Sequence, residues 1–395
     1  MADKQIEKYL PKLRFPEFKN DGEWQVVRLG DVVRCFSGGT PSATNKDYYG
    51  GDIPFIRSGE LHSSKTELYL TRAGLENSSA KMVEKGTILY ALYGATSGDV
   101  GIARVSGAIN QAILAIIPNV NIDKMYLYQY LSYSKDFIIN RFLQGGQGNL
   151  SASIITSLSI PLPTIQEQKK IASCLSSLDE CIALSKKKLE QLKAHKSGLM
   201  QKLFPAPGKT LLEYRFPEFK DEGEWKIMKV KDVCSIETGK SNTQDQVNDG
   251  KYPFFIRSEN PVRSDKYLYD CEAVITIGDG KIGQVYHYIN GKFDLHQRCY
   301  KMSDFKGVDG KYFYYYFSSH FYERAMRMSA KATVDSVRLE MIADMPIAVP
   351  CIKEQRAIAS LFSSLDECIT ASKEKLDQLK AYKRGLMQQM FPLLY

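Results

Sequence analysis

The sequence predicts an α+β fold: two globular α/β-type domains joined by two long antiparallel helices that form a coiled coil. The main observation is an internal repeat, because residues 160–205 and 347–392 are identical at about 30 of 46 aligned positions without a gap. Both copies space their apolar residues in steps of three and four, which is typical of a coiled-coil seam. A segment of short β-prone runs precedes each copy. Together these features predict a pseudo-twofold repeat.

Each predicted helix begins just after a proline, near Gln166 or Lys353, and ends at a Phe-Pro pair that starts at Phe204 or Phe391. One such helix cannot bury its apolar stripe alone, so we expect the two to pack on each other. One Ser and one Lys interrupt the seam at equivalent places, and such polar positions can fix register. The apolar seam residues are Ile171, Leu175, Leu178, Ile182, Leu189, Leu192 and Leu199, and Ile358, Phe362, Leu365, Ile369, Leu376, Leu379 and Leu386.

The repeat unit has three parts: an entrance motif, a globular segment and a long helix. The entrance motif RFPEF occurs twice, and the two tryptophans, Trp24 and Trp225, follow it at equivalent places, so we expect them to anchor packing. The expected divisions are a leader at 1–22, a first domain at 23–158, a first helical spacer at 159–205, a linker at 206–223, a second domain at 224–345 and a second helical spacer at 346–395.

The two globular segments show the same order of events with little identity. The first has the β-prone runs VVRLGDVVRCF, DIPFIRS, GTILYALYG, GIARV and AILAII, and then a helical stretch at Lys124–Phe142. In the second, FFIRS echoes PFIRS, DLHQR echoes AINQA, and an aromatic stretch at Lys311–Phe321 echoes the tyrosine-rich helix. The helices agree closely while these segments diverge, which indicates a common frame that carries two different heads.

Composition restricts the class of protein. A chain of 395 residues has room for two or more domains, and a net charge of +8 allows a polyanionic partner without requiring one. The eight cysteines lie apart without a CxxC pair, which favours reduced thiols over a zinc site. The start, MADKQIEKYL, lacks the apolar core of a signal peptide, and no apolar run is long enough for a membrane span. We therefore expect a cytoplasmic protein without membrane contact.

Motifs for catalysis are missing or incomplete. Gly278–Gly283 matches GxGxxG, but a strand-like run follows it where a dinucleotide site needs a helix, so a β-turn is expected. The GKT and GKS triplets at 208–210 and 239–241 lack the leading glycine of a P-loop. An amino-methyltransferase motif is also absent. The sequence thus predicts no catalytic residue, no metal site and no cofactor bound by this chain.

What remains favours binding to a polyanion, because glycine-rich loops with hydroxyl, amide and basic side chains reach phosphates and base edges. Each residue alone is also an ordinary surface or turn residue, but the set recurs at matched places in both heads. In the first head the candidates are Gly39, Thr40, Ser42, Arg57, Ser58, Thr96, Ser97, Asn110, Gln111, Gln144, Gln147 and Asn149. In the second they are Lys240, Ser241, Arg257, Ser258, Asp279, Lys281, Gln297, Arg298, Lys331, Thr333 and Arg338. The tyrosine run at 312–316 fits either a base-stacking surface or, better, the core face of a helix.

At this point the chain resembles the specificity subunit of a type I restriction–modification enzyme, over essentially its whole length. The resemblance is carried by the lead-ins PTIQEQKKIA and PCIKEQRAIA, the ends GLMQKLFP and GLMQQMFP, RFPEF, GGTPS…GGDIPFIRS, ALYGATSGDVGI, INQAIL and NLSASIITSLSIPLP. It implies that each head is a target recognition domain for one half of a bipartite, asymmetric site in double-stranded DNA. It further implies that the helices set the spacer and dock two modification (methyltransferase) subunits.

The same resemblance implies that S-adenosylmethionine, ATP and magnesium bind to partner subunits, and that restriction subunits join the complex for ATP-driven cleavage of foreign DNA such as that of phage. The loop residues follow no fixed pattern between heads, so the DNA sequence that is read does not carry over. Two alternatives stay open: a self-sufficient restriction or modification enzyme, against which the missing motifs argue, and a coiled-coil scaffold or binding module with no role on DNA.

Overall fold

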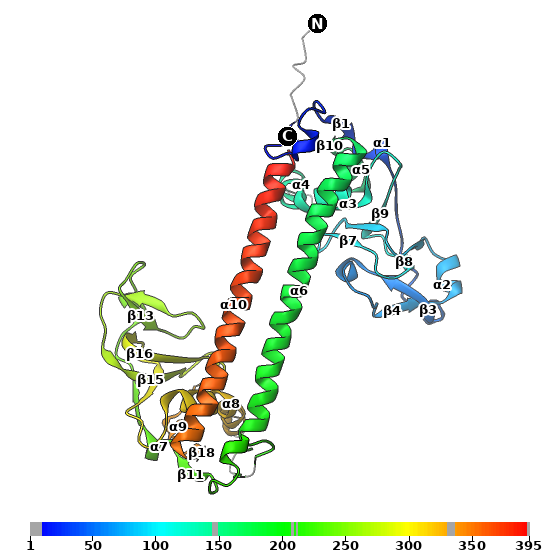
Figure 1. The fold of residues 1–395 in the computed structure, drawn as a ribbon. Coiled ribbons are helices and arrows are strands. Elements are labelled where there is room, and N and C mark those ends of the chain that lie inside the picture. The colour runs from blue at the N-terminus through cyan, green and yellow to red at the C-terminus, as the bar shows by residue number, and fades with distance from the viewer. Residues whose placement is uncertain (1–9, 144–148, 207–208, 211, 330–335, 393–395) are drawn as a thin grey trace. The chain divides into compact units, whose positions relative to one another are not determined.

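The computed structural model describes residues 10–143, 149–206, 209–210, 212–329 and 336–392. The chain divides into two compact units (Figure 1). Unit 1 takes in the described residues up to Ser185 and those from Lys375 onward, and unit 2 takes in Lys186–Glu374. Each unit therefore combines one globular domain with a part of each long helix, α6 (Ile165–Leu203) and α10 (Ile352–Met390).

The globular part of unit 1 is made of small sheets with short connections. One sheet has the strand order β2-β9-β6-β7, another has the order β4-β3-β8-β5, and a separate antiparallel pair joins β1 to β10. The strands are β1 (Gln25–Arg28), β2 (Val33–Ser37), β3 (Tyr49–Ile56), β4 (Leu68–Leu70), β5 (Lys81–Val83), β6 (Ile88–Ala91), β7 (Val100–Ile102), β8 (Gly107–Ile109), β9 (Ile113–Pro118) and β10 (Ser159–Leu162). The helices are α1 (Leu29–Val32), α2 (Arg72–Glu76), α3 (Lys124–Tyr133), α4 (Lys135–Phe142) and α5 (Ala152–Thr156), with 3₁₀ turns η1 (Pro16–Phe18), η2 (Lys46–Tyr48) and η3 (Ser58–Glu60).

Two local features of unit 1 differ from the sequence expectation. The β-prone run VVRLGDVVRCF is broken by α1, because Leu29 and Val32 turn into the core and Gly30 packs closely on Thr156. A Cβ on Gly30 would lie 3.1 Å from the Thr156 carbonyl oxygen. The helical stretch at Lys124–Phe142 is split at Ser134, whose ψ of −2° ends α3 and starts α4.

Unit 2 repeats this plan with one larger sheet. Its order is β12-β17-β15-β16-β13-β14, and a separate antiparallel pair joins β11 to β18. The strands are β11 (Lys226–Lys229), β12 (Ser235–Thr238), β13 (Tyr252–Phe255), β14 (Val262–Ser264), β15 (Tyr269–Ile277), β16 (Tyr286–Leu295), β17 (Cys299–Ser303) and β18 (Pro346–Val349). The helices are α7 (Val230–Val233), α8 (Gly310–Ser329) and α9 (Leu339–Ala343), with 3₁₀ turns η4 (Pro217–Phe219) and η5 (Thr243–Asp245).

Two predictions for unit 2 are confirmed. The GxGxxG match lies between β15 and β16, so it is a strand-to-strand turn and not the start of a helix. The tyrosine run lies in α8, where Tyr312 is 0 % exposed and Tyr316 1 % exposed. These rings belong to the core of unit 2 and do not form a base-stacking surface.

Helices α6 and α10 run antiparallel within each unit. In unit 1 the Lys383 ammonium of α10 donates to Asp179 of α6 at 2.5 Å, and Leu13 and Arg14 link Gln389 to Glu167. The start of α6 therefore lies beside the end of α10 (Figure 1). Unit 2 contains the reciprocal contact, in which Lys196 of α6 donates to Asp366 of α10 at 2.5 Å. The predicted fold class, two α/β domains joined by long antiparallel helices, is confirmed.

These lysines are the polar seam positions noted in the sequence. Their Asp partners also accept hydrogen bonds from the globular parts, Asp179 from Gln129 at 2.7 Å and Asp366 from Tyr315 at 2.8 Å. Seam residues Ile171, Leu175, Leu189, Ile358, Phe362 and Leu376 are buried, whereas Leu178, Ile182, Leu192, Leu199, Leu365, Ile369, Leu379 and Leu386 are partly exposed.

A buried arginine–glutamate pair fixes the start of each long helix. In unit 1, Arg14 donates to both carboxylate oxygens of Glu167 at 2.8 Å, and the Trp24 indole donates to the same carboxylate at 3.2 Å. In unit 2, Arg215 makes the same two-point contact with Glu354, at 2.9 and 2.7 Å. Both glutamates are at most 1 % exposed, so each charge is neutralised where water is excluded.

The glutamine that follows each glutamate joins the helix to the domain. Gln168 accepts from the Asp123 backbone N–H at 2.7 Å, and Asp123 caps α3 through the N–H groups of Met125 and Tyr126. Gln355 and Asp309 repeat this arrangement at α8, with the first bond at 2.8 Å. The repeated Glu-Gln of the lead-ins is therefore a joint between two helices in each unit.

The Phe-Pro end of each long helix packs into the domain that belongs to the other repeat. Phe391 at the end of α10 makes edge contacts with Tyr126 and Tyr130 of α3 in unit 1. Phe204 at the end of α6 makes the matching contacts with Tyr312 and Tyr316 of α8 in unit 2. Each core is therefore closed by a residue from a distant part of the chain.

The buried pairs lead to a first prediction. Glu167→Ala should destabilise unit 1 by about 3–5 kcal/mol, because it leaves the Arg14 guanidinium buried without its partner. Hydrogen exchange should show the loss in unit 1, and Glu354→Ala should show it in unit 2. Glu17→Ala is the control, because the Glu17–Lys170 pair is exposed and should matter little. If all three variants lowered protection from hydrogen exchange equally and in both units, the role given to the buried pair would be contradicted.

The aromatic ends lead to a second prediction. Phe391→Ala should loosen the core around α3 at a cost of about 3–5 kcal/mol, because it removes a ring that is 1 % exposed. Phe204→Ala should do the same around α8. Hydrogen exchange of α3 and α8 measures both effects, and each variant is the control for the other. Protection that changes only at the mutated helix end would contradict the cross-repeat packing.

Candidate nucleic-acid interface

Both units place a polar dipeptide just beyond the carboxyl end of a parallel strand pair. In unit 1, β3 pairs with β8, and the Asn110 N–H donates to the Ile56 carbonyl at 3.3 Å. In unit 2, β13 pairs with β16, and the His296 N–H donates to the Phe255 carbonyl at 3.0 Å. AINQA and DLHQR are thus structurally equivalent, and the exposed Gln111 and Gln297 occupy the same position.

A glycine loop packs against each dipeptide. The Gly39 N–H donates to the Ile109 carbonyl at 3.2 Å, and the Lys240 N–H donates to the Leu295 carbonyl at 3.1 Å. A Cβ on Gly38 would lie 1.8 Å from the Ile109 oxygen, so only glycine allows this approach. In unit 1 the next residue, Thr40, bonds the glutamine side chain, and in unit 2 Asn242, two residues after Lys240, does so.

The partner of each glutamine differs between the heads. Thr40 donates to the Gln111 side-chain oxygen, whereas Gln297 donates to the Asn242 side-chain oxygen at 2.5 Å. These bonds leave the side-chain nitrogen of Gln111 available as a donor and the side-chain oxygen of Gln297 available as an acceptor. Asn242 was missed in the sequence, although it follows the predicted Lys240-Ser241 directly.

The remaining candidates of unit 1 divide into loop-forming and surface residues. Ser42 bonds Thr44 at 2.8 Å, and Ser97 donates to the Gly94 carbonyl at 2.9 Å. The Thr96 hydroxyl is buried without a hydrogen bond, and Asn149 forms a β-bridge with Tyr93. Ser58 starts the 3₁₀ turn η3. Gln144 and Gln147 lie outside the described residues.

Arg57, which was expected at the interface, is bound by two carboxylates of its own chain. Its Nε and Nη2 contact Glu60 at 3.2 and 3.4 Å, and Nη2 also contacts Glu67 at 2.5 Å. The hydrogen bonds that Arg57 donates to Glu60 and Glu67 raise its pKa. The side of the guanidinium that could bind a base edge in two-point fashion is therefore occupied within the chain.

Arg257 and Arg298 of unit 2 both bind one aspartate. Arg257 Nη1 contacts the Asp279 oxygens at 3.2 and 3.3 Å, and Arg298 Nη1 contacts one of them at 2.8 Å. Burial acts to raise the pKa of Asp279, but the bonds from Arg298 and Arg257 outweigh it, so the pKa is lowered. Burial, and next the charge of Arg257, lower the pKa of the neighbouring His296.

The other unit 2 candidates have mixed surroundings. Ser241 donates to the buried Asp294 at 2.7 Å, Ser258 donates to the Asn260 carbonyl, and Lys281 pairs with Glu259 at 2.6 Å. Lys240 is exposed, and Arg338 is exposed before α9. Lys331 and Thr333 lie outside the described residues. The structure thus brings Ser241, Gln297, Arg298, Asp279 and Arg257 together through direct contacts between neighbouring loops.

PFIRS and FFIRS align in the sequence, but the pairing of the second with its neighbouring strand is shifted by one residue. Phe55 pairs with Ala108, whereas Phe254, and not Phe255, pairs with the equivalent Asp294. Unit 2 therefore has one more residue between the strand pair and its arginine. This shift accompanies the difference in partners: Arg57 stays within its own segment, and Arg257 reaches the loop that carries Asp279.

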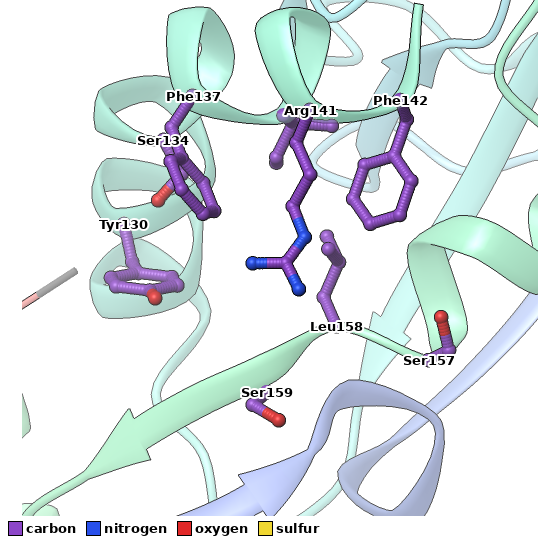
Figure 2. Close-up of a pocket in the computed structure, with 9 residues that line it drawn as sticks. Tyr130, Ser134, Phe137, Arg141, Phe142, Ser157, Leu158 and Ser159 are labelled. Carbon is purple, nitrogen blue, oxygen red and sulfur yellow. The ribbon is translucent and has the colours of Figure 1, made fainter. Parts of the chain in front are cut away.

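A separate cavity of about 290 Å³ lies in unit 1 between α4 and β10 (Figure 2). The Arg141 guanidinium extends into it, 5.8 Å from the ring centroids of Phe137 and Phe142, and Ser157 and Ser159 lie opposite. Among the residues that the structure describes, none of the predicted interface residues lines this cavity. Over the part of the chain that the structure describes, no cluster of three or more metal-ligating side chains occurs, and no helix is long and apolar enough to cross a membrane.

Comparisons with known proteins agree with this architecture. The family model "Type I restriction modification DNA specificity domain" matches residues 21–194 and again residues 222–381. The chain is 24% identical to the MjaVIII specificity subunit of Methanocaldococcus jannaschii, over 95% of this chain and 92% of that protein. It is 28% identical to the EcoR124I/EcoR124II specificity subunit of Escherichia coli, over 45% and 46%.

The fold is similar to that of a solved relative. The crystal structure of the type I restriction–modification S subunit from M. genitalium has a TM-score of 0.70 and 17% identity, and covers 98% of this chain and 100% of that one. Since the family model matches both repeats, each with its domain and most of its long helix, the chain belongs to the family of type I restriction–modification DNA specificity subunits.

Proposed function

We propose that this specificity subunit recognises a bipartite, asymmetric target in double-stranded DNA, and that each unit reads one half. The observation that carries this proposal is the shared loop frame of the two units. Gly39 and Lys240 make equivalent bonds to the strand below, and Gln111 and Gln297 occupy the same position. Their side-chain partners differ: Thr40 in one unit and Asn242, one position further along the loop, in the other. Different side chains on one frame would read different bases, since base edges are distinguished by their donors and acceptors.

Chemistry belongs to partner subunits in this proposal. Two modification subunits dock on the helix pair and carry S-adenosylmethionine, and restriction subunits that use ATP and magnesium join them in the cytoplasm. The segments 23–158 and 224–345 are the two target recognition domains, and the helical segments 159–205 and 346–395 set the distance between the half-sites. The reciprocal contacts of Lys196 and Lys383 support equivalent docking places for two identical subunits.

The proposal can be tested by mapping N6-methyladenine in a host genome with and without this gene, in the presence of the modification subunit. The expected result is methylation at one split motif that depends on the gene. Methylation by this chain alone would favour a self-sufficient enzyme, and a complex that selects no DNA sequence would favour a scaffold.

Domain exchange gives a third prediction. If residues 23–158 are replaced by the corresponding segment of a relative, one half of the methylated motif should change and the other should stay. The reason is that the loop frame of unit 2 makes its contacts within unit 2. The reciprocal exchange of residues 224–345 is the control, and a change in both halves would show that the units do not read independently.

Helix length gives a fourth prediction. Four residues inserted after both Ser185 and Ser372 lengthen each helix by about 6 Å, nearly two base pairs at about 3.4 Å each. The half-sites should stay the same while the gap between them widens by one or two base pairs, because a four-residue insertion causes only a local stutter in the seam. Methylation mapping measures the gap, and an unchanged gap would mean that the helices do not set it.

A further inference from the structure

Unit 2 presents two arginines in a fixed arrangement on one loop cluster. Arg257 follows β13, Arg298 follows the turn after β16, and both bind Asp279 in the turn after β15. The two arginine side chains are 47% and 62% exposed, whereas that of Asp279 is 14% exposed. The aspartate is therefore partly buried, and the two guanidinium groups that it binds lie at the surface.

Each arginine uses only one of its nitrogens for this contact. Both donate to Asp279 through Nη1, and no bond from Nε or Nη2 of either residue occurs among the described residues. The Nε–Nη2 side of a guanidinium is a two-point donor, and the major-groove edge of guanine offers two matching acceptors, O6 and N7. Asp279 thus holds each arginine while leaving this side available.

Arg57 of unit 1 provides the contrast inside the same chain. There the Nε and Nη2 atoms are bound to Glu60 and Glu67. The local charge also differs: two arginines and one aspartate give +1 in unit 2, and one arginine with two glutamates gives −1 in unit 1. Of these two clusters, that of unit 2 combines two-point donors that have no partner among the described residues with a net charge that attracts DNA.

We infer that Asp279 is a positioning residue that aligns Arg257 and Arg298 as a two-pronged reader of guanine, so the half-site bound by unit 2 contains guanine at two positions. This inference rests on the proposed function and adds the class of base that one head selects. An arginine that is already held loses less conformational freedom on binding, which favours discrimination between bases over general attraction to phosphate.

The test uses the full chain in complex with its modification subunits and a library of duplexes with randomised half-sites. The wild type should select guanine at two positions of one half. Arg257→Ala and Arg298→Ala should each lower the preference for guanine at a different one of these positions, by about 10- to 100-fold. Asp279→Asn should weaken both preferences, Asp279→Glu should restore them in part, and the other half-site should be unaffected.

Arg356→Ala is the matched control, because it removes an arginine of unit 2 that is 72% exposed and lies on α10. It should leave both half-site sequences unchanged. If the alanine variants weaken binding to all duplexes equally, the arginines contact phosphates and the inference is overturned. If the wild type selects a half-site through unit 2 that contains no guanine, the inference is overturned and the proposed function stands. A wild-type complex that selects no sequence overturns both.

Discussion

The buried ion pair at the start of each long helix is the contact on which the architecture depends. Arg14 and Arg215 come from the entrance motifs, and Glu167 and Glu354 come from the helices, more than a hundred residues later in the chain. Removing one partner would leave a charge where water cannot reach it, so the pair strongly disfavours other arrangements of domain and helix. The neighbouring glutamines extend this control to α3 and α8, and the orientation of each domain helix follows from the start of the long helix.

While this ion pair is the same in both units, the loops of the candidate interface differ between them. They lie beyond the ends of β3 and β8, or β13 and β16, and contribute little to the buried core. His296 accepts from the Arg298 N–H, and Asn110 accepts in the same way from the Ala112 N–H, so two different side chains support the same loop geometry. This separation explains how the two repeats keep nearly the same helices while their domains share little sequence.

The arrangement of domains and long helices could be predicted from the sequence, but the contacts of the candidate interface residues could not. The three-four seam, the repeated lead-ins and the order of elements predicted two domains and an antiparallel helix pair, because helix packing depends on periodicity that can be counted. The echo of PFIRS in FFIRS predicted equivalent arginines, but a register shift of one residue gives them different partners. Glu60 and Glu67 lie three and ten residues after Arg57, whereas Asp279 lies in a loop 22 residues after Arg257, and the repeated motif itself contains none of these carboxylates.

The ends of the long helices also have a consequence for synthesis on the ribosome. Unit 1 begins first, yet its core includes Met387 and Phe391, which are made near the end of translation. The residues of unit 2 end at Glu374, before these two are made. The second domain can therefore reach its native state before the first, and the nascent first domain must remain unclosed for more than two hundred residues of elongation. Until Phe391 is made, Tyr126 and Tyr130 of α3 lack the ring that packs on them in the folded unit, and incompletely packed cores are prone to aggregation.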